Sequence, residues 1–309
     1  MSAGGWTLAD APRLDGRVAL VTGSTGGLGT ETALGLARLG AEVIVSGRNA
    51  QRGAAALGLI RQAVPTAKVA FEMLDLASLA SVEGFAARHG PAALDILINN
   101  AAVMALPARA TTADGFEMQF GTNYLGHVAL TAALTPALLR SRFGARIVSL
   151  ASLAHRKGRI AFDDLQGERR YDGWAAYRQS KLAMLMFARA LQRHATARGW
   201  PLRSIAAHPG WALTQIIRNG PGRSDPAWKV ALMQLVFGLM SQSAEAGARP
   251  ILFAATAPEA EPGGYYGPTR SGERKGPVGS SMVEAQALDL DAEERLWAVS
   301  TQLTGARWP

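Results

Sequence analysis

The sequence predicts an α/β fold with a doubly wound parallel sheet, formed by one domain over residues 1–309. First, short apolar runs alternate with longer helical patterns, as in parallel strands joined by crossover helices. Second, these runs are continuously apolar, as expected for strands that are buried on both faces. Third, no internal repeat or low-complexity linker divides the chain.

The order of the expected elements follows from these runs. Strands are predicted at 17–23, 41–47, 68–76, 94–100, 145–152, 202–210 and, as a short last strand, 263–268. Helices are predicted up to Leu39, up to Ala63, and over 113–139, 174–198, 229–240 and 243–256, followed by a C-terminal helical extension over 283–303. In such a sheet, ligands bind at the carboxyl ends of the strands, near the point where the strand order switches.

The charge pattern argues against a nucleic-acid partner. The net charge is +8 and the pI is about 10.3, but the arginines are scattered singly and the only dense basic cluster lies at 155–159. Aromatic residues make up 7% of the chain and do not alternate with basic residues as a base-stacking platform would. We therefore interpret the basic residues as a solvated surface.

The absence of cysteine excludes disulfides and thiolate metal sites, which fits a reducing cytoplasm. The first residues lack an apolar run of signal-peptide length. The longest strongly apolar run, over 230–240, is too short to cross a bilayer. A cytoplasmic protein without a transmembrane segment or a metal site is the expectation.

A glycine-rich turn, TGSTGGLG at 22–29, directly follows the first strand and opens a helix. Gly23 permits a tight turn, whereas Gly27 and Gly29 allow a pyrophosphate and the strand to approach closely. The helix N-terminus adds N–H donors and a favourable dipole. This context predicts a dinucleotide-binding Rossmann fold, the alternative being a turn without a ligand. No Lys-Ser/Thr pair follows the glycines, which excludes a P-loop.

The end of the second strand bears on the choice of dinucleotide. It reads VSGRN at 45–49, without the carboxylate that usually binds the ribose hydroxyl of NAD. Arg48 can instead meet a 2′-phosphate, with Ser24 and Asn49 as nearby donors. NADP(H) is therefore favoured over NAD(H), which stays the second choice. The alternative is that Arg48 is an ordinary surface residue.

Candidate catalytic groups follow the glycine turn in the order Asn123, Ser152, Tyr177 and Lys181. Tyr177 and Lys181 are four positions apart, which places them on one helix face. Carbonyl reduction needs a hydride on carbon and a proton on oxygen. A free tyrosine has a pKa of about 10, and a nearby ammonium lowers this pKa. Taken singly, these residues are equally consistent with an amphipathic helix face, a capping serine and a buried amide.

Seven motifs together resemble the short-chain dehydrogenase/reductase family. They are TGSTGGLG (22–29), DL (75–76), NNAA (99–102), NYLGH (123–127), SLAS (149–152), YRQSK (177–181) and HPG (208–210). The gap between Gly23 and Gly27 is similar to that of the compact branch of the family and unlike that of the extended epimerase branch. The later stretches at 242–256 and 295–305 are similar to the retinol-dehydrogenase-like subgroup.

The resemblance implies further roles. Asn123 would hold a water that links Lys181 to solvent, and Lys181 would also reach the nicotinamide ribose. Asp75 and Leu76 would lie at the adenine, Asn99 and Ala101 along the ribose side, and Pro209, Gly210 and Thr214 at the carboxamide. The expected cofactor-binding residues are Gly23, Ser24, Thr25, Gly27, Leu28, Gly29, Arg48, Asn49, Asp75, Leu76, Asn99, Ala101, Tyr177, Lys181, Pro209, Gly210 and Thr214. Asp75 is alternatively a helix N-terminal residue.

The chain departs from the family pattern at Ala102, at Ala151, where a second serine is common, and in the insert between Ser152 and Tyr177. Ala102 replaces a glycine that often follows the fourth strand, which matters if this position requires a positive φ. The insert between Ser152 and Tyr177 is charged and is expected to overhang the substrate with its charges in water, the alternative being that they meet a polar group of the substrate. The apolar segment 211–243 is a candidate substrate lid, with core or a membrane-contacting surface as alternatives.

Together these observations predict an NADP(H)-preferring oxidoreductase that interconverts a carbonyl and an alcohol on a small, lipophilic substrate. Tyr177 would act as general acid/base, and Ser152 would orient the oxygen. The alternatives are a C=C reductase of the same family and a non-catalytic NADP(H)-binding sensor or scaffold. A homodimer or homotetramer is implied by the resemblance alone.

Overall fold

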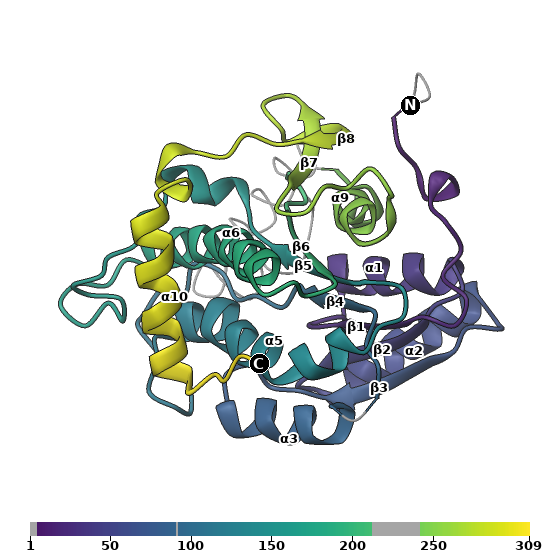
Figure 1. The fold of residues 1–309 in the computed structure, drawn as a ribbon, viewed down its shortest axis with the longest axis horizontal. Coiled ribbons are helices and arrows are strands. Elements are labelled where there is room, and N and C mark those ends of the chain that lie inside the picture. The colour runs from purple at the N-terminus through teal and green to yellow at the C-terminus, as the bar shows by residue number, and fades with distance from the viewer. Residues whose placement is uncertain (1–4, 91, 212–241) are drawn as a thin grey trace, which may run out of the picture.

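The computed structural model describes residues 5–90, 92–211 and 242–309, and within them one sheet runs in the order β3-β2-β1-β4-β5-β6-β7-β8 (Figure 1). Neighbouring strands are parallel except for β7 and β8, which are antiparallel. The strands are β1 (Val18–Val21), β2 (Glu42–Gly47), β3 (Val69–Met73), β4 (Ile96–Asn99), β5 (Ala145–Leu150), β6 (Leu202–Ala207), β7 (Tyr265–Arg270) and β8 (Lys275–Ser280). The doubly wound α/β prediction is confirmed.

Helices cover both faces of the sheet (Figure 1). One layer contains α1 (Gly27–Arg38), α2 (Ala50–Ala63) and α9 (Ala244–Thr256); the other contains α3 (Leu79–His89), α5 (Gly126–Leu139) and α6 (Gly173–Ala197). The C-terminal helix α10 (Leu290–Thr304) packs outside α5 and α6. Each layer buries its own apolar cluster against the sheet, which explains why the central strands are apolar on both sides.

The strand order reverses between β1 and β4. From β1 the sheet continues through β2 to β3 on one side and through β4 to β5 and β6 on the other. The loops that leave the carboxyl ends of β1 and β4 therefore diverge to opposite faces and leave a crevice between them. The glycine turn and the NNAA motif both lie at this edge of the sheet.

Three elements differ from the sequence-based expectation. Residues 275–280, for which no strand was predicted, form β8, an edge strand that has no apolar run because edge strands are partly exposed to solvent. The helix expected over 113–139 begins at Met118, where Glu117 caps it, and contains a wide turn over Gly121–Leu125 before α5. The C-terminal helix begins at Leu290 rather than 283, because the Asp289 side chain caps its first turn. The helix near 229–240 and residues 212–241 of the lid segment lie outside the described residues.

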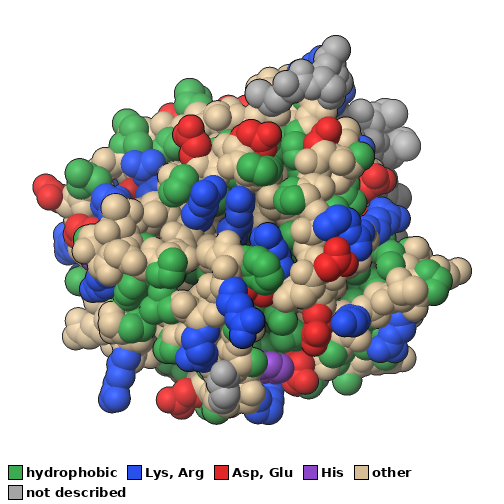
Figure 2. All heavy atoms as spheres, turned by 45° about the vertical axis from the view of Figure 1, so that its right-hand side comes forward, with side chains coloured by type: hydrophobic (Ala, Val, Ile, Leu, Met, Phe, Trp, Pro, Cys, Tyr) green, Lys and Arg blue, Asp and Glu red, His purple; other side chains and the backbone are tan. Residues whose placement is uncertain are grey.

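The surface agrees with the view of a solvated basic exterior. Figure 2 shows Lys and Arg side chains interspersed with acidic, hydrophobic and polar ones over the face in view, without one continuous basic field. Among the described residues, no helix combines the length and the apolar character that spanning a bilayer requires.

Candidate active site

The glycine turn has the backbone that a pyrophosphate site needs. Gly23 and Gly27 have φ of +62° and +54°, in the left-handed region that favours glycine. A Cβ at Gly29 would lie 2.5 Å from the Gly23 carbonyl oxygen. Gly26 precedes α1 and provides no side-chain cap, so the N–H groups of the first turn are available to an anionic ligand. These residues therefore fit the diphosphate of a dinucleotide.

The loop after β4 is fixed to this turn by Thr22 and Asn100. The Thr22 hydroxyl oxygen accepts hydrogen bonds from the backbone N–H groups of Asn100 (2.8 Å) and Ala101 (3.0 Å). The Asn100 amide donates to the carbonyl oxygens of Thr22 (2.7 Å) and Gly23 (3.2 Å). Asn100 was absent from the predicted site, although the doubled asparagine of NNAA was a signal for it.

Asn99 is a correction to the prediction. Its side chain is 1% exposed and donates to the Thr131 hydroxyl (3.0 Å), on the α5 side of the sheet. Successive residues of a strand point to opposite faces. The Asn99 side chain therefore lies in the core and not along the cofactor crevice, whereas Ala101 remains half-buried at the crevice.

Ser24 is a second correction. Its hydroxyl donates to the Val21 carbonyl (2.7 Å) and accepts from the Ser46 N–H (2.9 Å), and the side chain is fully buried. It therefore joins β1 to β2 and is not a donor to a 2′-phosphate. Thr25 lies nearer the expected phosphate position, since a Cβ on Gly47 would be 2.8 Å from its methyl carbon.

The remaining residues of the adenosine side divide into two groups. Arg48 is exposed directly after β2, as a phosphate-binding residue should be, whereas the Asn49 amide oxygen accepts the Arg52 N–H (2.9 Å) and caps α2. Asp75 is half-buried after β3, and one carboxylate oxygen accepts the Ala77 N–H (3.0 Å). The Leu76 side chain is 6% exposed within the core, and the expected place of Leu76 beside the adenine stays a prediction.

On the nicotinamide side of the expected cofactor site, the structure describes the chain after β6 up to residue 211. Pro209 and Gly210 are half-buried directly after β6, at the same edge of the sheet, and Thr214 lies outside the described residues. Ala102 is not among the described non-glycine residues with positive φ, which are Ala105, Ser271 and Glu273. Alanine is therefore accommodated there without left-handed strain.

The catalytic candidates Ser152, Tyr177 and Lys181 are brought together. Ser152 lies two residues beyond β5, where its hydroxyl oxygen accepts the Ala154 N–H (3.2 Å) and its side chain lies close enough to the Tyr177 phenol to affect the pKa of that phenol. Lys181 lies one turn after Tyr177 on α6, with its Nζ 6.0 Å from the centroid of the Tyr177 ring. Both side chains are nearly buried, and Lys181 Nζ donates to the Leu150 carbonyl (2.9 Å).

The pKa of Tyr177 shifts in the direction opposite to the sequence-based expectation. In the chain alone, burial raises this pKa to about 12, and the nearby Ser152 side chain lowers it only in part. Burial also lowers the pKa of Lys181 to about 8. Desolvation of the phenolate is therefore the dominant effect on this pKa. Tyr177 is held protonated at neutral pH, as a proton donor to a carbonyl must be.

Asn123 lies in the wide turn between Gly121 and Leu125 and is fully buried. Its amide forms two hydrogen bonds with the backbone of Val103 (2.8 and 2.9 Å) and donates to the Ser180 hydroxyl (2.9 Å). Asn123 thereby joins the loop after β4 to α6. Its expected role in a proton relay stays a prediction.

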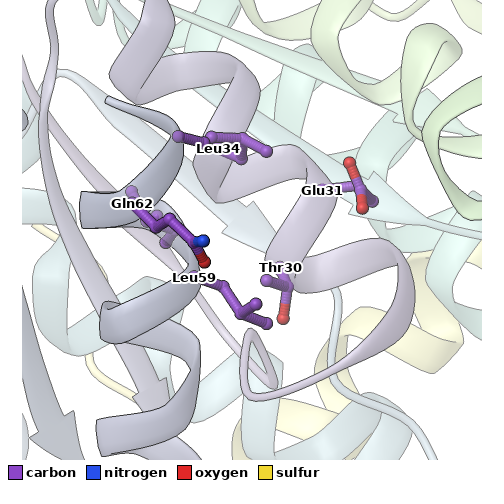
Figure 3. A pocket seen from close by; sticks show the side chains of 7 residues that line it. Thr30, Glu31, Leu34, Leu59 and Gln62 are labelled. Carbon is purple, nitrogen blue, oxygen red and sulfur yellow. The ribbon is translucent and has the colours of Figure 1, made fainter. Parts of the chain in front are cut away.

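A groove between α1 and α2 lies apart from these residues (Figure 3). It is lined by Thr30, Glu31, Leu34, Leu59, Ile60, Gln62 and Ala63. None of the catalytic candidates contributes to its lining. We therefore place the candidate active site at the carboxyl edge of the sheet, where the glycine turn, Ser152 and Tyr177 lie.

Known proteins resemble this chain over nearly its whole length. The family model for short chain dehydrogenase matches residues 17–221. Polyprenol dehydrogenase of Mus musculus is 42% identical over 96% of this chain and 86% of its own. Retinol dehydrogenase 12 of Mus musculus is 38% identical over 96% of this chain and 89% of its own.

Two solved structures extend the comparison. A crystal structure of an uncharacterised protein from Mycobacterium paratuberculosis matches with a TM-score of 0.81 and 38% identity, covering 99% of both chains. The second is from Beutenbergia cavernae and is described as an NAD(P)-dependent gluconate 5-dehydrogenase with NADP bound at low occupancy. It matches with a TM-score of 0.59 and 27% identity, covering 79% of this chain and 91% of its own.

The chain belongs to the short-chain dehydrogenase family, among its retinol-dehydrogenase-like members. It is therefore an oxidoreductase that uses a nicotinamide dinucleotide. The family match and the glycine turn agree, because the matched region contains both the dinucleotide crevice and the Ser152, Tyr177 and Lys181 cluster.

Proposed function

We propose that this protein is an NADP(H)-preferring oxidoreductase that interconverts a carbonyl and an alcohol on a small, lipophilic substrate. The observation that carries the proposal is the position of Tyr177. Its phenol lies beside Ser152 and one helical turn from Lys181, at the carboxyl edge of the sheet.

Each residue has a distinct part in the reaction. When bound, NADP(H) supplies or accepts the hydride at the substrate carbon. The turn at 22–29 holds the pyrophosphate through backbone N–H groups, and Arg48 pairs with the 2′-phosphate. In the reduction, the Ser152 hydroxyl orients the substrate oxygen and Tyr177 gives it a proton. The Lys181 cation stabilises the phenolate that remains, and the alcohol oxidation reverses these steps.

Two observations support a lipophilic substrate. Trp174 is 45% exposed at the start of α6, and its ring lies 6.1 Å from that of Tyr177 in an edge-to-face arrangement. This places an exposed apolar surface beside the proposed proton donor. In addition, the named relatives are dehydrogenases of polyprenol and retinol, which are both lipophilic alcohols.

The experiment is a substrate panel. NADPH oxidation is measured with long-chain and terpenoid aldehydes and ketones, and with short hydrophilic ones as the comparison. The proposal requires turnover, with kcat/KM higher for the lipophilic carbonyls. Products from conjugated enones are analysed as well, since saturation of the C=C bond would favour the alternative reductase. NADPH binding without turnover of any compound would favour a sensor or scaffold.

The Arg48→Ala variant tests the cofactor preference. Removing a charge-assisted contact to the 2′-phosphate is expected to weaken NADP⁺ binding by about 10- to 100-fold. NAD⁺ binding should change by less than about twofold, because NAD⁺ lacks this phosphate. Isothermal titration calorimetry with both nucleotides measures the two affinities.

Arg52→Ala is the matched control for this variant, since Arg52 is also an exposed arginine, located in the first turn of α2. It should leave both affinities unchanged. An equal loss of NADP⁺ and NAD⁺ binding in Arg48→Ala would refute the 2′-phosphate role.

A further inference from the structure

The loop after β6 is built on the β7–β8 hairpin. Beyond the end of β6, the His208 N–H donates to the Tyr266 carbonyl (2.9 Å), and the Trp211 N–H donates to the Arg274 carbonyl (2.8 Å) in the hairpin turn. Gly210 has a φ of +63°, and a Cβ there would clash with the same Arg274 oxygen. The path of residues 208–211 therefore depends on the hairpin.

His208 connects this loop to an acidic residue of the hairpin. Its ring is fully buried, and its Nδ1 accepts the Gly210 N–H (3.1 Å), so Nδ1 has no proton. The proton therefore lies on Nε2, which faces a Glu273 carboxylate oxygen (3.2 Å) and the Ser281 hydroxyl (2.9 Å). A carboxylate at Nε2 fixes this tautomer, and the tautomer in turn fixes the hydrogen bond to Gly210.

Glu273 also connects to the segment that follows Ser152. Its carboxylate lies 2.9 Å from Arg156 Nη2, and Arg156 belongs to the short helix Leu153–Lys157 that begins directly after Ser152. The other carboxylate oxygen accepts the Met282 N–H (3.1 Å). Burial would raise the pKa of Glu273, but these partners lower it to about 2, so the carboxylate is ionised at neutral pH.

The backbone at Glu273 is strained. Its φ is +64°, and Ser271 in the same turn has a φ of +55°. Residues with a Cβ rarely adopt this region, and such strain persists only where the surroundings determine it. Here the strained turn directs the carboxylate toward His208 and Arg156.

From these contacts we propose that Glu273 is a positioning residue for the nicotinamide end of the cofactor site. It holds the Pro209–Gly210 turn through His208 and the Ser152 segment through Arg156, so that both keep one relative position. The proposal rests on the proposed function, in which the turn after β6 faces the carboxamide. The nicotinamide end of the site is thereby positioned by the β7–β8 hairpin, which lies outside the residues 17–221 that the family model matches.

The test compares Glu273→Gln with Glu284→Gln. Glu284 is the matched control because it also faces Arg156, with its Oε1 3.8 Å from the Arg156 Nε. His208 Nε2, in contrast, faces Glu273 and Ser281. Affinity is measured by calorimetry for NADP⁺ and for adenosine 2′,5′-bisphosphate, which has the 2′-phosphate but no nicotinamide. Thermal unfolding is recorded for each variant.

In Glu273→Gln, an amide oxygen and an NH₂ group replace the two carboxylate oxygens. Because the NH₂ group cannot accept a hydrogen bond, either the His208 or the Met282 N–H loses its acceptor. We expect NADP⁺ affinity to fall by about tenfold and bisphosphate affinity to stay within about twofold. Glu284→Gln should change neither. Glu273→Gly, which relieves the positive φ, should give the same split even if it raises the unfolding temperature.

Two results would overturn the proposal. An equal loss of both affinities in Glu273→Gln would show a general structural role, and no change in either would show no role. If the wild type bound neither NADP⁺ nor the bisphosphate, the proposed function would be refuted, and the positioning role with it.

Discussion

Replacing Tyr177 with phenylalanine is expected to lower kcat for carbonyl reduction by about 10²- to 10⁴-fold. The variant removes the only proton donor that the account places beside the substrate oxygen, and it leaves the ring that packs against Trp174. Steady-state oxidation of NADPH, with the best carbonyl from the panel, measures the loss. Because the phenol is held protonated by burial, the wild-type reduction needs no prior ionisation of this group.

Tyr171→Phe is the matched control for this variant. Tyr171 is also a partly buried phenol near α6, but its hydroxyl donates to the Leu106 carbonyl (3.2 Å) and accepts from the Gln119 amide (3.1 Å). Its removal should leave kcat within about threefold. NADP⁺ affinity of Tyr177→Phe should be close to the wild-type value. If Tyr177→Phe retained wild-type turnover, the proposed proton transfer would be wrong.

Replacing Lys181 with methionine is expected to lower kcat by about 10²- to 10³-fold, since it removes the charge that stabilises the phenolate in the transition state. Lys181 is 4% exposed, so its charge lies inside the protein beside Tyr177. NADP⁺ affinity should fall as well, because the proposed contact to the nicotinamide ribose is lost. Turnover and calorimetry on the same preparation separate the two effects. Unchanged turnover would contradict the role of the cation.

The same variant has a stability signature that depends on pH. Burial lowers the pKa of Lys181 from 10.5 to about 8, so the folded chain loses this proton at a lower pH than the unfolded chain. Between these values the unfolded state binds more protons, and the free energy of unfolding therefore rises with pH. The burial penalty is fully present below about pH 8 and is relieved toward pH 10.5.

Urea unfolding across this range measures the difference between wild type and Lys181→Met. As pH rises, the free energy of unfolding of the wild type should increase relative to that of Lys181→Met by up to about 3 kcal/mol. This follows because one pKa unit corresponds to about 1.4 kcal/mol. Groups common to both proteins cancel in the difference. A difference that is independent of pH would show that the pKa of Lys181 is not lowered.

The central part of the fold could be predicted from the sequence because its strands are buried on both faces. Continuous apolar runs at β1, β4 and β5 leave a strong signal, and the glycine turn locates the crevice. The hairpin strand β8 has exposed residues and two glycines within its six residues, so its pairing is set by contact with β7 rather than by its own composition.

Within the site, spacing predicted neighbours but not the direction of each side chain. The i, i+4 relation of Tyr177 and Lys181 was correct because it follows from helical geometry. Ser24 and Asn99 were wrong because their orientation depends on the pleat and on partners such as Ser46 and Thr131. Glu273 could not be found, since it reaches His208 from 65 residues away in the chain.

The sign of the Tyr177 pKa shift was missed for a related reason. The lysine is visible in the sequence, whereas burial arises from segments that are distant in the chain and meet only in the fold. In the structure burial is the larger effect, and it raises the pKa to about 12. The proposed mechanism therefore requires that the bound cofactor, together with Lys181, lowers the pKa of Tyr177.

Ultraviolet titration of tyrosinate with and without saturating NADP⁺ tests this requirement most directly. The Tyr177 signal is isolated as the difference between wild type and Tyr177→Phe, over the pH range in which the chain stays folded. We expect bound NADP⁺ to lower the Tyr177 pKa well below about 12. A Tyr177 pKa that stays near 12 with NADP⁺ bound would contradict it.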